Sequence, residues 1–199
     1  TIHALTGMNS TESTDTITCS SSTKEIKITN IKIIYTNPNG VVCIRDDYTD
    51  IITIYDNIIF NGTQLALNSY GVVKINDSTI TIESTNGIES QEVCEAERII
   101  ISGKTNISSS SPNSSLFYFK ADSNPYIIFS CKSDIIISIS TNEFMSGTNK
   151  LNFTILHDTS VHLTTGNGFS SRPSNGANNV LIDERASFTF IEKSHQRIP

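Results

Sequence analysis

Short apolar pairs recur along the chain at a nearly regular interval. In each pair one residue separates two apolar residues, and successive pairs lie roughly 21 to 28 residues apart. The pairs are Ile26/Ile28, Ile52/Ile54, Val73/Ile75, Ile99/Ile101, Ile127/Phe129, Phe153/Ile155 and Val180/Ile182. Side chains two residues apart lie on the same face of a β-strand. The pattern therefore predicts a short strand at each pair, with the two apolar side chains in the core.

Two further apolar stripes follow each pair. The second begins about 6 to 8 residues after the first. It runs through Ile33/Tyr35, Ile58/Phe60, Ile80/Ile82, Ile107, Ile135/Ile137, Val161/Leu163 and Phe188/Phe190. The weaker third stripe runs through Val42/Ile44, Leu65/Leu67, Ile88, Leu116/Tyr118, Phe144 and Phe169. Three short strands per repeat are typical of one coil of a solenoid, in which stacked coils bury a shared apolar column.

We therefore predict an all-β protein, a single-domain right-handed parallel β-helix of about seven coils that spans residues 1–199. Residues 1–25 are expected to form an N-terminal cap and residues 193–199 a C-terminal tail. The turn residues expected between strands include Asn61-Gly62, Ser102-Gly103 and Ser146-Gly147. A β-sandwich or jelly roll is the alternative, because it also contains many short strands at close spacing.

Composition supports strands and narrows the choice of partners. Ile outnumbers Leu by about four to one, and β-branched residues favour strands over helices. Charged residues make up 17% of the chain and the formal net charge is -6. The clustered Lys and Arg of a nucleic-acid-binding surface are absent, so nucleic acid is not an expected partner. No apolar run reaches the roughly 18 residues of a spanning helix, and no membrane insertion is expected.

Two polar stretches interrupt the repeat. Residues 108–115 are almost all Ser, and residues 166–179 are rich in Gly, Asn and Ser. We expect both to be loops that project from the stack, and loops on a rigid scaffold commonly carry recognition residues. Tolerated insertions without a function are the alternative. The candidate ligand-binding residues are Ser110, Asn113, Asn167, Arg172 and Asn175.

The four cysteines are Cys19, Cys43, Cys94 and Cys131. None belongs to a Cys-x-x-Cys pair, which argues against a zinc ribbon or a thioredoxin-type site. Their even number predicts two disulfides, with three possible connectivities. Four buried free thiols are the alternative.

The acidic residues do not form a convincing catalytic pair. Asp46, Asp47 and Asp50 are the best candidates for the paired carboxylates of a glycan-cleaving enzyme, but a solvated corner between strands explains them equally well. The Glu residues around Cys94 lack the order of a calcium-binding loop. We therefore predict no metal, no cofactor and no enzymatic activity.

Two other patterns bear on chemistry or binding. His157-Asp158 is expected to mark a corner rather than half of a catalytic triad, because the chain lacks a Gly-x-Ser-x-Gly motif. Thr79 and Thr81 fit one coil of an ice-binding Thr array. With Lys104, Asp134 and Ser160 taken as the matching positions, the array does not continue.

The chain resembles the β-helical domains of cell-surface adhesins. Its Ile, Ser, Thr and Asn content, its even number of cysteines and its stacked short strands are similar to those of fungal cell-wall adhesin N-terminal domains. The sequence Asn37-Pro38-Asn39-Gly40 resembles the Asn-Pro-Asn-Gly motif of bacterial filamentous-haemagglutinin-type domains. Both resemblances imply attachment to a host or surface ligand.

The leading functional hypothesis is a secreted or surface-exposed, non-enzymatic attachment domain. Its partner would be a glycan or protein receptor on a host cell or another surface, contacted through the two loops. One alternative is a polysaccharide-degrading β-helix enzyme or a phage tailspike fragment that uses Asp46, Asp47 and Asp50. Another is a structural fibre segment. The oligomeric state is not predicted by the sequence.

Overall fold

The computed structural model describes residues 14–18, 25–35, 41–46, 52–62, 65–69, 71–82, 98–110, 116–119, 126–140, 144–147, 150–169 and 178–193. These residues form nineteen β-strands and no helix. Every strand pairing among them is parallel. Sandwiches and jelly rolls are built from antiparallel pairs, so the sandwich alternative is wrong for this part of the chain.

Two long parallel sheets run the length of the molecule. The first sheet contains β2 (Glu25–Thr29), β5 (Ile52–Asp56), β8 (Val72–Asn76), β10 (Arg98–Ser102), β13 (Tyr126–Phe129), β16 (Asn152–Ile155) and β18 (Asn179–Ile182). The second sheet contains β3 (Lys32–Tyr35), β6 (Ile59–Gly62), β9 (Thr79–Ile82), β11 (Lys104–Ser109), β14 (Asp134–Ile139), β17 (Ser160–Thr165) and β19 (Ser187–Glu192). In both sheets the spatial order of the strands follows the sequence order.

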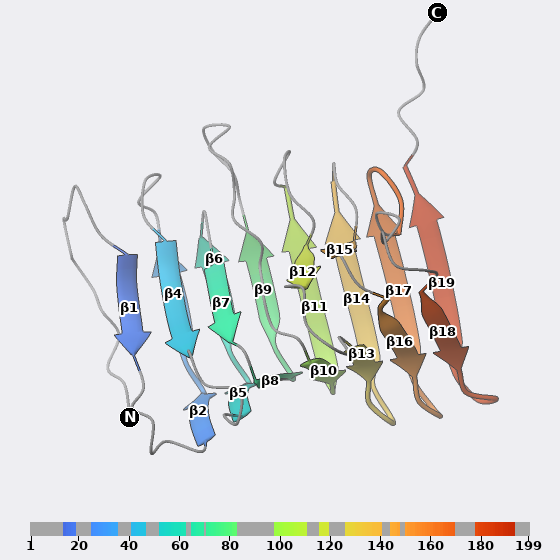
Figure 1. Ribbon diagram of the computed structural model, residues 1–199, viewed down its shortest axis with the longest axis horizontal. Coiled ribbons are helices and arrows are strands. Elements are labelled where there is room, and N and C mark those ends of the chain that lie inside the picture. The colour runs from blue at the N-terminus through green and yellow to red at the C-terminus, as the bar shows by residue number, and fades with distance from the viewer. Residues whose placement is uncertain are drawn as a thin grey trace, which may run out of the picture.

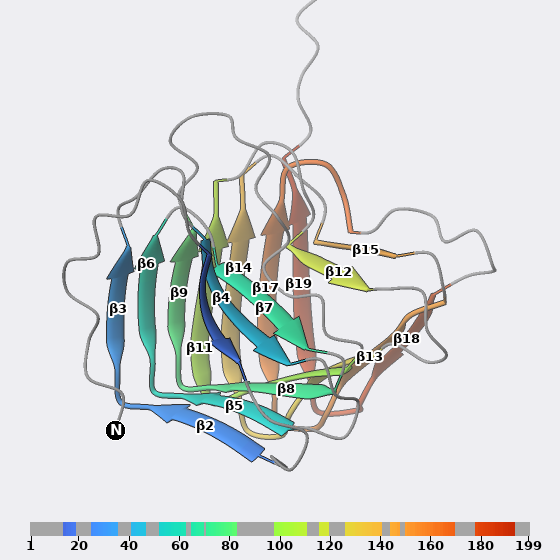
Figure 2. The ribbon, with the colours of Figure 1, turned by 60° about the vertical axis from the view of Figure 1, so that its left-hand side comes forward.

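Shorter sheets form a third face. One contains β1 (Thr14–Thr18), β4 (Val41–Asp46) and β7 (Leu65–Ser69), and the other contains β12 (Phe117–Phe119) and β15 (Met145–Gly147). Figure 1 shows the strands of successive turns side by side, and Figure 2 shows the three walls that they build. Four turns have a described strand on all three faces: β2-β3-β4, β5-β6-β7, β10-β11-β12 and β13-β14-β15. The fold is therefore a parallel β-solenoid.

The core is a stack of apolar columns between the walls. One column in the first sheet joins Ile75, Ile101, Phe129 and Ile155, which pair in register on neighbouring strands and are fully buried. Phenylalanines fill the C-terminal half of the core with edge-on and tilted ring contacts, through Phe117, Phe129, Phe144, Phe153, Phe169 and Phe188. One turn cannot bury its own inward face, so the stacking supplies most of the apolar burial.

The first six corners between the first and second sheets each contain one left-handed residue. Positive φ values occur at Asn30, Asn57, Asp77, Gly103, Lys132 and Asp158. Gly, Asn and Asp adopt this conformation at the lowest cost, which explains five of these six residues directly. The expected corner at Ser102-Gly103 is confirmed, whereas Asn61-Gly62 lies within β6 and Ser146-Gly147 lies within β15.

One predicted inward pair lies on the outer face, because the alternate residues of that strand point into the core. In β5 the side chains of Thr53 and Tyr55 are buried, and those of Ile52 and Ile54 lie on the outer face. Thr53 and Tyr55 pair with Ile26 and Ile28 on β2. In the first four turns the last inward strand residue lies two positions before the left-handed residue, as in Tyr55 and Asn57, so Thr53 and Tyr55 are the inward residues of β5.

Candidate functional site

The outer face of the second sheet carries a row of hydroxyl groups. Thr81, Ser108, Ser138 and Thr164 occupy the same register position on β9, β11, β14 and β17. All four are partly exposed, and the Ser108 Oγ donates to the Thr81 Oγ1 at 3.4 Å. We call these four residues the hydroxyl row. Because neighbouring strands lie about 4.8 Å apart, the row presents a hydroxyl group at that interval along the solenoid axis.

A second row of side chains lies beside the hydroxyl row on the same face. Its register positions are filled by Lys32, Ile59, Thr79, Asn106, Ile136, His162 and Thr189. All seven side chains are exposed. His162 is held by the Ser160 hydroxyl at 3.2 Å from its Nε2. The face therefore combines hydrogen-bonding groups with two exposed aliphatic side chains, Ile59 and Ile136.

The register corrects the positions compared for the Thr array. Thr79 pairs with Asn106 rather than with Lys104, and Asn106 pairs with Ile136. The correct continuation is thus two residues further along each strand. In that register the hydroxyl row continues beyond Thr81, but the row that contains Thr79 becomes chemically mixed.

The two predicted loops leave the second sheet at one edge. Ser110 directly follows β11, is exposed, and donates its backbone N–H to the Ile82 carbonyl at 3.0 Å. Asn167 follows β17 and is also exposed. Parallel strands end at the same edge of a sheet, so Ser110 and Asn167 lie on one edge with β14 between their strands. Asn113, Arg172 and Asn175 lie outside the described residues.

The first loop is shorter than predicted. Ser108 and Ser109 belong to β11, where Ser109 is buried. Sequence reasoning assigned them to a loop because a run of Ser residues has no apolar alternation. The two side chains do alternate between the faces of the strand, but both are Ser, so the sequence does not show it. Ser109 points inward, as do its register partners Ile82 and Ile139 on the neighbouring strands.

Of the three carboxylates proposed for catalysis, Asp46 alone lies among the described residues. Asp46 is the last residue of β4, so the strand extends two residues beyond the expected start of the corner after Ile44. Asp47 and Asp50 lie outside the described residues. The same holds for Cys19, Cys94 and the Glu residues around Cys94.

Cys131 is a free thiol, which corrects its predicted place in a disulfide. It lies in the corner between β13 and β14, and its sulfur is 3.6 Å from His157 Nδ1. Cys43 is in β4, and its backbone pairs with Thr16 and Ala66 on the neighbouring strands.

A third residue joins Cys131 and His157 at this corner. The Asp183 Oδ2 lies 3.7 Å from the same His157 Nδ1. The expectation that His157 marks a corner is confirmed, because it lies between β16 and β17. Sequence reasoning missed the cluster, since its members are 26 residues apart in each step and only the stacking of the corners brings them together.

Comparison with known proteins finds no matching family model, no similar curated protein and no similar solved structure. Among the described residues, no three His, Cys, Asp or Glu side chains are placed so that they could hold a metal ion. In the Cys131 cluster, two groups approach a single nitrogen rather than surrounding a common centre. The described part of the chain also has no helix long and apolar enough to cross a membrane.

Proposed function

We propose that this chain is a secreted or surface-exposed, non-enzymatic attachment domain that binds a glycan on a host cell or another surface. The observation that carries the proposal is the hydroxyl row on the outer face of the second sheet. A hydroxyl group both donates and accepts hydrogen bonds, as the hydroxyl groups of a sugar do. Weak contacts repeated at a fixed interval suit an extended ligand with repeated chemical groups.

The surroundings of the row add to this proposal. Ile59 and Ile136 expose about half of their surface on the same face and offer apolar contacts to the C–H faces of sugar rings. The loops that follow Ser110 and Asn167 begin at the edge of this face, so both can contribute further contacts. We also infer a right-handed stack of seven coils in one domain, one coil for each strand of the two long sheets.

The test measures retention on a panel of immobilised polysaccharides and host glycans, together with the release of new reducing ends in the same wells. The double variant Ser138→Ala/Thr164→Ala removes two hydroxyls from the row. We expect its retention to fall at least about tenfold, because two desolvated hydrogen-bonding partners of the ligand lose their contacts. Ser130→Ala/Thr154→Ala removes one hydroxyl directly after β13 and one from the outer face of β16 in the first sheet, and this variant should bind normally.

Equal losses in the two double variants would show that the hydroxyl row is not the contact surface. The absence of retention on every glycan would overturn the proposed ligand class and leave a protein receptor or a fibre role. Release of reducing ends by the unmodified chain would overturn the non-enzymatic assignment. In that case Asp46, Asp47 and Asp50 become the first residues to substitute.

A further inference from the structure

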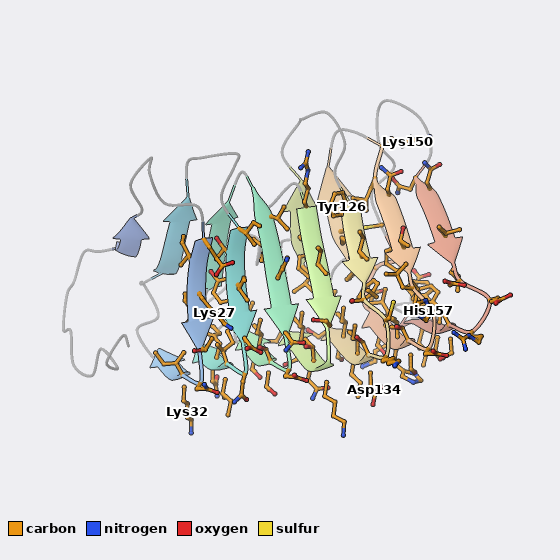
Figure 3. All side chains as sticks on the ribbon, turned by 90° about the horizontal axis from the view of Figure 1, so that it is seen from below. Lys27, Lys32, Tyr126, Asp134, Lys150 and His157 are labelled. Carbon is orange, nitrogen blue, oxygen red and sulfur yellow. The ribbon has the colours of Figure 1, made fainter. Side chains whose placement is uncertain are left out.

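Three consecutive corners align Cys131, His157 and Asp183 along one edge of the solenoid. The corner after β13 and the corner after β16 have the same length, because Phe129 pairs with Ile155 and Asp134 pairs with Ser160. Cys131 and His157 therefore occupy equivalent positions one turn apart. Figure 3 labels His157 at this corner, toward the C-terminal end of the molecule.

Local hydrogen bonds fix the backbone on which these side chains stand. The Ser133 Oγ donates to the Cys131 carbonyl at 3.4 Å, and the Thr159 Oγ1 donates to the His157 carbonyl at 3.3 Å. Asp183 is oriented through its other carboxylate oxygen, since the backbone N–H of Glu184 donates to its Oδ1 at 2.7 Å. The Asp183 Oδ2 is left facing the imidazole.

We propose that Cys131 is a reactive thiol that exchanges with low-molecular-weight disulfides, with His157 Nδ1 as the acceptor of the thiol proton. The cysteine sulfur and the Asp183 carboxylate approach the same nitrogen, at 3.6 and 3.7 Å. A proton transferred from the sulfur to Nδ1 thus stays beside a negative charge, which stabilises the imidazolium. The thiolate is the nucleophilic form of cysteine.

The exchange step is balanced without a further oxidant. The Cys131 thiolate attacks one sulfur of the small disulfide, forming a new S–S bond as the original S–S bond breaks. The departing sulfur takes the proton held on His157 Nδ1 and leaves as a thiol. Cys131 is oxidised to the mixed disulfide, and half of the small disulfide is reduced. Both Cys131 and His157 are partly exposed, so a small disulfide can reach the sulfur.

Other charged groups lie on this corner and the corners beside it. They are Lys104, Lys132, Asp134, Asp158, Glu184 and Arg185. Arg185 is paired with Asp158 at 3.3 Å. These groups are present in the unmodified chain and in every variant below. Their effect on the reactivity of Cys131 therefore cancels when the alkylation rates of Cys131 in two variants are compared.

The chain allows the reactivity of each cysteine to be read separately. Trypsin cleaves after Lys120 and Lys132, and the peptide 121–132 contains Cys131 as its sole cysteine. Cys19, Cys43 and Cys94 each fall in a different tryptic peptide. The first measurement is the rate of alkylation by iodoacetamide between about pH 6.5 and about pH 9, resolved by mass spectrometry of the peptides. When the pH is lowered across this range, the alkylation rate of an ordinary thiol falls on the order of a hundredfold, because protonation depletes the thiolate.

We expect the alkylation rate of Cys131 to fall less than about tenfold when the pH is lowered across that range. His157→Gln should restore the steep pH dependence of an ordinary thiol. Asp183→Asn should give an intermediate profile, as expected for a positioning residue. His162→Gln is the matched control, because it removes a histidine whose ring contacts Ser160 instead of a thiol. Its profile should equal that of the unmodified chain.

The second measurement uses glutathione disulfide at about pH 7. We expect one glutathione to be added to peptide 121–132 at least about tenfold faster in the unmodified chain than in His157→Gln, and none in Cys131→Ser. Thermal unfolding of each variant checks that the fold is retained. A steep alkylation profile in the unmodified chain, equal profiles with and without His157, or fast alkylation without glutathione addition would each overturn the proposal.

Discussion

At the scale of single residues, one buried hydroxyl has no hydrogen-bonding partner in the described structure. Thr53 is 2% exposed and points into the core from β5, where its column neighbours are Ile26 and Val73. Burying a hydroxyl group without a partner costs about 1–3 kcal/mol by mutational measures. Val has nearly the shape of Thr without the polar atom, so it fits the same column.

Thr53→Val should therefore raise the free energy of unfolding by about 1 kcal/mol, because it removes that desolvation cost. Chemical denaturation followed by circular dichroism measures the change. An unchanged or lower midpoint would show that the hydroxyl is satisfied in solution.

The left-handed corner position supports a pair of opposite predictions. At Gly103 a Cβ would overlap the Asp77 carboxylate and would also adopt a positive φ, so Gly103→Ala should destabilise the fold by about 1–3 kcal/mol. At Lys132 the same conformation is already held by a residue with an exposed side chain. Lys132→Gly should stabilise the fold by up to about 1 kcal/mol, because the backbone cost is relieved.

Thermal unfolding of both variants under identical conditions shows whether each substitution raises or lowers the stability of the fold. Shifts of the same sign at Gly103 and Lys132 would contradict the shared corner geometry. The sequence pointed to a corner at Gly103 from the residue type alone. It could not identify Lys132, because Lys is not a residue that favours positive φ and only the turn geometry forces it there.

At the scale of the elements, hydroxyl side chains hold successive corners between the two long sheets. The residue that follows the left-handed position is Ser78, Ser133 or Thr159 in three of the turns, and each is buried. Each donates its hydroxyl to the carbonyl two residues earlier. Thr159 also donates to the Ser130 carbonyl of the previous turn at 2.6 Å. Buried polar residues therefore join neighbouring turns.

Thr159→Val is expected to lower the free energy of unfolding by about 1–3 kcal/mol. The substitution leaves the partly buried carbonyls of Ser130 and His157 with fewer hydrogen-bonding partners, whereas Thr53→Val removes a hydroxyl that has no partner. The same chemical change should thus have opposite effects at two buried sites in neighbouring walls. Parallel denaturation curves for the two variants decide the point, and a neutral Thr159→Val would argue against a role for the hydroxyl in the corner.

Most strands could be predicted from the sequence, but their parity and register could not be predicted everywhere. Alternation identified β16 and β17 without ambiguity, because apolar residues there occupy only the inward positions. The inward pairs of β8, β10 and β13 were also identified correctly, although Val72, Ile100 and Ile128 lie on the outer face. It failed in β5, where both parities carry apolar side chains. It also misplaced the Thr79 row by two residues, since the corners differ in length and the repeat is not constant.

At the scale of the whole molecule, the two ends of the stack differ. At the N-terminal end, the inward Ile28 of β2 is 5% exposed. At the C-terminal end, the equivalent Ile182 of β18 is 43% exposed, and Leu181 and Ile191 expose more than half of their surface. Among the described strands, β18 and β19 have a paired neighbour on one side only. An exposed apolar edge of this kind favours pairing with other chains.

Leu181→Lys/Ile191→Lys should reduce concentration-dependent association, because charged side chains on an edge strand oppose strand pairing. Sedimentation velocity over a series of protein concentrations measures the effect. Ile59→Lys/Ile136→Lys is the matched control, since it adds the same charge at similarly exposed residues on interior strands. Equal behaviour of the two double variants would show that association does not involve the edge.

The candidate sites also depended on the whole molecule. The polar loops could be located from composition, because Ser, Gly and Asn runs stand out in a chain rich in Ile. The hydroxyl row and the Cys131, His157 and Asp183 cluster could not, since their members come from different turns. Only the strand register brings them into line.

The parallel register also determines how the molecule responds to force. The strands follow one another along a single axis, from β1 at one end to β18 and β19 at the other (Figure 1). Tension along this axis pulls directly on the hydrogen bonds between neighbouring turns and loads one layer of bonds at a time. Under tension the chain would then lengthen in steps, turn by turn, while the remaining turns stay folded.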